Sequence, residues 1–175
     1  MADPHQCVIL AIDPGQSSGW AIAVSGRPTV WGRASNHAER LSACELAAVE
    51  ADRHGLALVV VAEKWTAGGW ASHTTLLGLG AAWGAWRSAI EEAGIKRSRI
   101  VRVYTQTWRA RVLRPRFGAT TEQLKHLSAS MASAWTGEII ADHDVADALG
   151  ILRWATLAPQ VGEAIPRRKR KRKAQ

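Results

Sequence analysis

The chain has 175 residues, 47% of them apolar, which is enough for one α/β domain with a buried core but too few for two domains of ordinary size. No apolar stretch approaches the roughly 20 residues of a membrane-spanning helix, and the N-terminus lacks the pattern of a secretion signal. The formal net charge is +8, and a run of seven cations at 167–173 accounts for nearly all of it. Only two cysteines are present, both in apolar contexts, which favours buried thiols of a cytoplasmic protein over a disulfide or a zinc site.

Short β-branched apolar runs predict strands, and the longer segments between them carry helix start and stop signals. Asn36 and Glu39 have the spacing of a capping box, as do Thr120 and Gln123, and Gly55 follows the first predicted helix. In chain order we expect strands at 7–13, 19–25 and 28–34, a helix at 36–54, a strand at 56–62, a helix at 72–93, a strand at 99–104 and helices at 120–135 and 143–157. This order predicts an α/β fold with a mixed five-stranded sheet, its first three strands antiparallel, flanked by helices.

Four carboxylates occupy positions that are predicted to be at least partly buried, where a negative charge is unfavourable unless a cation or hydrogen bonds stabilise it. Asp13 and Glu63 each end an apolar run that is predicted to be a buried strand, and Asp144 and Asp147 share one face at the start of the last helix. Asp142 is placed to cap that helix. If the four acids converge they repel one another and require cations, which is the logic of a two-metal site for phosphoryl transfer. Each of these motifs is common in proteins without a metal site, so the prediction depends on all of them occurring in one chain.

Basic residues form two groups that predict contact with a polyanion, nucleic acid ahead of a membrane surface. No acidic residue occurs between Ala93 and Thr121, where arginines alternate with Trp108 and Phe117; forked guanidinium groups suit phosphates and aromatic rings suit bases. The alternatives are a solvated basic surface and a solubilising tail. The candidate DNA-binding cations are Arg109, Arg111, Arg114, Arg116, Lys125, Arg167, Arg168, Lys169 and Arg170.

Four segments, in order, resemble the RuvC-like Holliday junction resolvases of the ribonuclease H-like superfamily. They are Ile-Asp-Pro-Gly at 12–15, Val-Ala-Glu at 61–63, the glycine-rich helix at 77–84 and Asp-Val-Ala-Asp-Ala-Leu at 144–149. Lys125 is placed like a basic residue that this family keeps near its active site. Thr66 stands where the family often has an aromatic residue, so Trp65 or Trp70 is the candidate to replace it. The tryptophan content and the basic tail indicate a divergent member of a phage or mobile-element type.

The resemblance implies a nuclease domain at 1–158, and the run of like charges beyond it predicts a basic, disordered tail at 159–175. It implies that Asp13, Glu63, Asp144 and Asp147 bind two Mg²⁺ or Mn²⁺ ions, with Lys125 beside them, and that a homodimer cuts four-way DNA junctions. Neither a small-molecule cofactor nor a membrane is expected. Three alternatives remain: a nuclease of related fold acting on other branched DNA, one acting on pre-ribosomal RNA, and a non-catalytic nucleic-acid-binding protein. A sugar-kinase-like ATPase also begins with an Asp-x-Gly turn, but it needs a second phosphate loop that this chain lacks.

Overall fold

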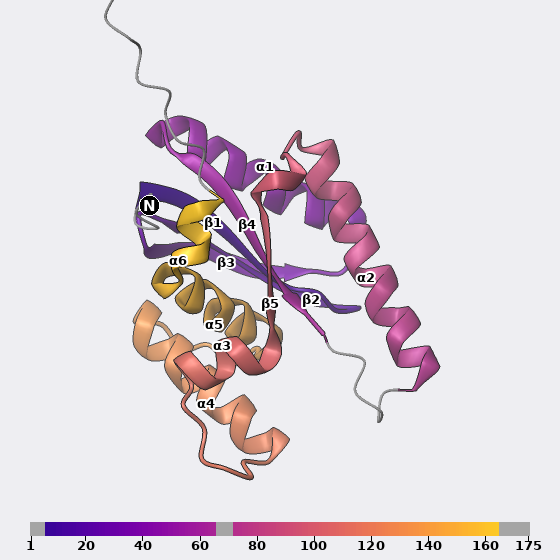
Figure 1. Ribbon diagram of the computed structural model, residues 1–175, viewed down its shortest axis with the longest axis vertical. Coiled ribbons are helices and arrows are strands. Elements are labelled where there is room, and N and C mark those ends of the chain that lie inside the picture. The colour runs from indigo at the N-terminus through magenta and orange to yellow at the C-terminus, as the bar shows by residue number, and fades with distance from the viewer. Residues whose placement is uncertain (1–5, 66–71, 165–175) are drawn as a thin grey trace, which may run out of the picture.

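The computed structural model describes residues 6–65 and 72–164, which form a five-stranded mixed sheet in the order β3-β2-β1-β4-β5 (Figure 1). β1 pairs antiparallel with β2, and β2 with β3, whereas β4 is parallel to both β1 and β5. The strands are β1 (Cys7–Asp13), β2 (Ser18–Val24), β3 (Arg27–Ala34), β4 (Ala57–Lys64) and β5 (Ile100–Tyr104). The mixed sheet expected from the sequence is therefore confirmed, with every strand end within two residues of the expected position.

Helices cover both faces of the sheet. α1 (His37–His54) and α2 (His73–Glu92) lie on one face (Figure 1). The other face carries α3 (Thr105–Val112), α4 (Thr121–Thr136), α5 (His143–Leu157) and α6 (Pro159–Glu163). A short 3₁₀ turn, Arg97–Arg99, leads into β5. Among the described residues, no helix combines the length and the apolar character needed to cross a membrane.

The central strand β1 supplies both hydrophobic cores because its side chains alternate between the two faces of the sheet. Cys7, Ile9 and Ala11 pack toward α5, and every one of them is fully buried. Val8, Leu10 and Ile12 pack toward α1 and α2 and are equally buried. The odd-numbered positions of β1 therefore face α5, which decides where Asp13 points.

The predicted helix caps are present. The Asn36 side chain accepts the amide hydrogen of Glu39, and Thr120 with Gln123 forms a reciprocal capping box. Gly55 ends α1 with a positive φ of 62°, a conformation that favours glycine.

Two helices were not predicted. α3 begins without a side-chain cap, so its sequence carries no start signal. α6 includes Val161, which is fully buried, so the packed part of the chain includes five residues that the sequence analysis assigned to the tail. The cation run itself lies outside the described residues.

α3 is fixed by its packing against α5. Trp108 is fully buried, and its ring lies over Gly150 of α5. A Cβ atom at Gly150 would lie 2.5 Å from the Trp108 ring, so only glycine permits this approach. Trp108 is therefore a core residue, and its ring is not available to stack on a base.

Candidate active site

Asp13 and Glu63 lie side by side at the carboxyl ends of two parallel strands. Ile12 of β1 is in register with Ala62 of β4, and each acid is the next residue along its strand. Both acids continue the row of side chains that faces α5, because they follow Ala11 and Val61 at the two-residue repeat of a strand. Glu63 lies within β4 rather than after it, one residue before the strand ends.

The first turn of α5 brings the other two acids to the same face. Asp142 caps the helix as predicted, with its side chain accepting the amide hydrogens of Asp144 and Val145 at 2.9 and 3.2 Å. Gly19 of β2 allows this turn to approach the sheet, since a Cβ atom at that position would lie 1.8 Å from the Asp144 carbonyl oxygen. Asp147 follows Asp144 by three residues and lies on the same side of the helix.

Electrostatic interaction links Asp13 to all three other acids. Burial is the largest cause that raises the pKa of Asp13 well above its ordinary value of 3.8, and the charges of Glu63, Asp147 and Asp144 add to it in that order. Arg109 opposes the shift. The four predicted acids therefore share one electrostatic environment, with Asp13 at its centre.

Glu63 is held rigidly by two donors from α3. Thr105 Oγ1 donates to Oε1 and Trp108 Nε1 donates to Oε2, both at 2.7 Å. The side chain is only 7% exposed, and burial raises its pKa although these two hydrogen bonds and the Arg109 charge lower it. α3, which the sequence did not predict, is thus the element that orients one of the four acids.

The two acids of α5 are each paired with an arginine. Asp147 accepts a hydrogen bond from Ser128 of α4 at 2.5 Å and forms an ion pair with Arg109 at 2.8 Å. Asp144 lies 3.7 Å from Arg33 of β3, which also pairs with Asp142 at 3.1 Å. Burial and the Asp142 charge raise the pKa of Asp144, whereas Arg33 lowers it. Arg33 and Ser128 were missed because nothing in their local sequence marks them.

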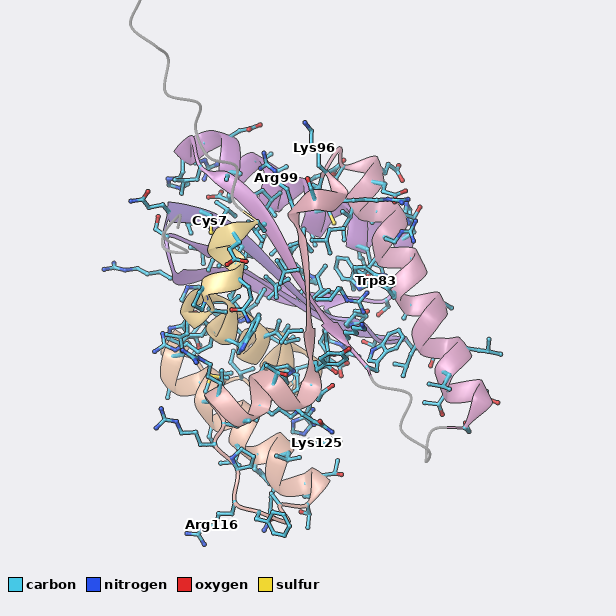
Figure 2. The ribbon with its side chains drawn as sticks, in the orientation of Figure 1. Cys7, Trp83, Lys96, Arg99, Arg116 and Lys125 are labelled. Atoms are coloured by element: carbon cyan, nitrogen blue, oxygen red, sulfur yellow. The ribbon has the colours of Figure 1, made fainter. Side chains whose placement is uncertain are left out.

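The predicted basic residues occupy different environments. Arg109 lies among the acids, and Arg111 donates to the carbonyl oxygen of Leu157 at 3.2 Å. Arg114 and Arg116 are exposed or partly exposed and lie in the loop between α3 and α4, which borders a cavity of about 680 Å³. Lys125 is exposed on α4, one turn before Ser128, and Figure 2 shows it on the same side of the sheet as α3.

The candidate aromatic contacts are only partly described. Trp65 is half-buried, and its indole nitrogen is enclosed without a hydrogen-bond partner among the described residues. Trp70 and the tail cations Arg167, Arg168, Lys169 and Arg170 lie outside the described residues.

The acids fit a divalent metal in chemistry but do not enclose one in this conformation. All four offer oxygen ligands, which Mg²⁺ and Mn²⁺ prefer, and a cation there would offset the repulsion that raises the pKa of Asp13. Within residues 6–65 and 72–164, however, no three acidic, histidine or cysteine side chains are arranged to hold an ion. In this conformation Asp147 and Asp144 are paired with Arg109 and Arg33.

Trp108→Phe is expected to lower the unfolding free energy by about 1–3 kcal/mol, because it removes a hydrogen bond to a buried carboxylate. It should also raise the pKa of Glu63 further, which moves any acid limb of an activity profile to higher pH. The matched control is Trp86→Phe, since the Trp86 indole nitrogen is buried without a partner and only ring volume is lost. Denaturant unfolding and a pH profile measure the two effects; equal losses in both variants would contradict a specific role for the Trp108 bond.

Comparison with known proteins identifies the fold. Two solved structures are similar over most of their length: Thermus thermophilus RuvC in complex with a Holliday junction substrate, and Thermus thermophilus RuvC alone. The first is 21% identical, with a TM-score of 0.58 over 88% of this chain and 96% of that one. The second is 23% identical, with a TM-score of 0.57 over 87% of this chain and 96% of that one. No family model matches the sequence, and no curated protein matches it.

Proposed function

We propose that this chain, which shares its ribonuclease H-like fold with the RuvC structures, is a metal-dependent DNA endonuclease that resolves four-way junctions by paired symmetric nicks. The observation that carries the proposal is that carboxylates on β4 and α5 lie close enough to Asp13 of β1 to raise its pKa, so that all four acids interact. The similar structure described with a Holliday junction substrate suggests the kind of DNA.

In the proposed site, Asp13, Glu63, Asp144 and Asp147 hold two Mg²⁺ or Mn²⁺ ions. The ions would supply an activated water and stabilise the charge on the leaving oxygen, giving 5′-phosphate ends. Trp108 and Thr105 keep Glu63 in one orientation while this occurs. Holding the acids in fixed positions is the main contribution of the protein to such a reaction.

The exposed cations near the site would hold the DNA by its phosphates. Lys125 lies one turn from Ser128, which contacts Asp147, so it is placed to neutralise charge on a phosphate close to the acids. The side chains of Arg114 and Arg116 are exposed and make no hydrogen bond or ion pair within the described residues, so they are free to bind a DNA arm. The cation run at 167–173 would add salt-sensitive affinity without sequence preference.

A homodimer suits this function because two symmetric nicks require two active sites. On α2, Leu77 is 61% exposed, and Gly78, Gly80 and Gly84 have open space where a Cβ atom would lie. An apolar helix face with small residues allows another helix to approach closely, so α2 is the proposed contact between the two copies.

The proposal is tested by cleavage of labelled four-way junction, fork, flap, duplex DNA and duplex RNA with Mg²⁺ or Mn²⁺. We expect the junction to be cut at least about tenfold faster than duplex DNA, with paired nicks that leave 5′-phosphate ends; this ratio corresponds to about 1.4 kcal/mol of transition-state discrimination. Preferential cutting of flaps or RNA would assign the site to another nuclease, and binding of junctions without cleavage under either metal would favour a non-catalytic DNA-binding protein.

A further inference from the structure

Arg109 lies inside the group of acids rather than on the basic surface. Its Nη2 atom is 2.8 Å from Asp147 Oδ2, and its side chain is 29% exposed. The same guanidinium charge lowers the pKa of both Asp13 and Glu63, so it acts on three of the four carboxylates. Its Nε atom is buried and has no hydrogen-bond partner. The other arginine on α3 that makes a described contact, Arg111, bonds only to the Leu157 carbonyl oxygen.

Both carboxylate oxygens of Asp147 accept a hydrogen bond in this arrangement. One carboxylate oxygen accepts from the Ser128 hydroxyl and the other accepts from Arg109. A divalent cation at Asp147 would therefore compete with a guanidinium that carries its own positive charge. Two cations a few ångströms apart in a partly buried site repel strongly, so the ion pair opposes metal binding.

A phosphate offers the guanidinium an alternative partner. Arginine donates in a fork that fits both phosphate and carboxylate, and Arg109 binds Asp147 through Nη2 alone. A DNA phosphate entering the site would accept hydrogen bonds from the guanidinium, and the negative charge of the phosphate would favour the transfer of Arg109 from Asp147. Asp147 would then be left free to bind a cation.

We propose that Arg109 is a counter-ion that engages Asp147 in the DNA-free protein and transfers to a phosphate of bound DNA, so that DNA and divalent metal each strengthen the binding of the other. This inference rests on the proposed nuclease function. It makes Arg109 a positioning residue for metal and DNA, because its side chain occupies one carboxylate oxygen of Asp147 in the DNA-free protein. Because linkage is reciprocal, the same factor applies to either ligand.

The test is Mn²⁺ binding to the full chain, measured by loss of the electron paramagnetic resonance signal of free Mn²⁺. It is done with and without a four-way junction that carries phosphorothioate linkages through its crossover to slow cleavage. In the wild type we expect the junction to tighten Mn²⁺ binding by about tenfold, within the usual range of coupling between sites. In Arg109→Gln, Mn²⁺ should bind about tenfold more tightly without DNA, and the junction should change this affinity by less than about twofold.

Arg111→Gln is the matched control, because it removes one cation from the same helix without touching an acid. Its DNA-free Mn²⁺ affinity should stay within about twofold of the wild type and the coupling should persist. Arg109→Lys, which keeps the charge but loses the fork, serves if Arg109→Gln fails to fold, and reduced coupling is then expected. Coupling equal to that of the wild type in either Arg109 variant overturns the inference while leaving the nuclease proposal intact. Failure of the wild type to bind Mn²⁺ under any condition overturns both.

Discussion

Asp13→Asn is expected to reduce junction cleavage by about 10³-fold or more while leaving junction affinity within about threefold of the wild type, since a loss of about 4 kcal/mol of transition-state stabilisation is typical when a metal site is disabled. The charges of the other three acids all raise the pKa of Asp13, so its loss removes the central member of the proposed ligand set. Cleavage rates under saturating enzyme and a binding assay without metal separate the two effects.

Asp52→Asn is the control for this variant. It makes the same chemical change at an exposed position on α1, away from the acids, and should cleave at the wild-type rate. Retention of more than about a tenth of wild-type cleavage in Asp13→Asn would contradict the proposed role, because that loss corresponds to less than about 1.4 kcal/mol.

The same substitution should stabilise the metal-free protein at neutral pH. Because the pKa of Asp13 is raised on folding, the folded protein binds this proton more tightly than the unfolded chain does. The resulting stabilisation is fully present below the ordinary pKa of 3.8 and is lost as the pH rises through the folded value. In EDTA, Asp13→Asn should therefore show a higher melting temperature than the wild type at neutral pH. A lower melting temperature would show that the ionised carboxylate is not destabilising.

Gly19→Ala should damage both the fold and the acidic site. The new Cβ atom would lie 1.8 Å from the Asp144 carbonyl oxygen and 2.8 Å from the Val145 nitrogen, so the first turn of α5 must move. We expect a loss of about 3 kcal/mol in unfolding free energy, at the upper end of overpacking costs. Cleavage should fall by about 100-fold, since a displacement of roughly 1 Å in a catalytic group has effects of that size. Denaturant unfolding and cleavage rates measure the two losses.

Gly32→Ala is the control with a smaller expected effect, because it adds the same methyl group to β3, the strand beside β2. Its Cβ atom would meet only the Trp20 ring, at 3.1 Å, and a side chain can yield where a helix backbone cannot. It should lose less than about 1 kcal/mol and keep most of its activity. If the two variants lose equal stability and activity, the contact of Gly19 with α5 is not what places Asp144.

The sequence predicted the features that depend on local patterns. Continuous apolar runs located β1 and β4, and the capping signals located the starts of α1 and α4. An acid directly after or within such a run identified Asp13 and Glu63 as residues that burial would perturb, and the structure raises the pKa of both. Whether these acids bind metal remains a prediction.

Features that depend on tertiary packing were not predictable in the same way. α3 has no cap and gains its stability by burying Trp108 against Gly150, a contact between positions distant in the sequence. Arg109 and Arg111 are two residues apart and look equivalent in the sequence, yet a helix directs them to different sides, one toward the acids and one toward Leu157.

The placement of α5 against β1 and β2 has a consequence for synthesis of the protein. Asp13 and Asp144 are 131 residues apart in the sequence, so at about 5–20 residues per second the first strand leaves the ribosome roughly 7–26 seconds before the helix that covers it. During that interval the face of β1 that carries Ile9 and Ala11 has no α5 to cover it. A nascent chain therefore exposes apolar surface that favours aggregation, and it cannot assemble its four acids until the first turn of α5 has been synthesised.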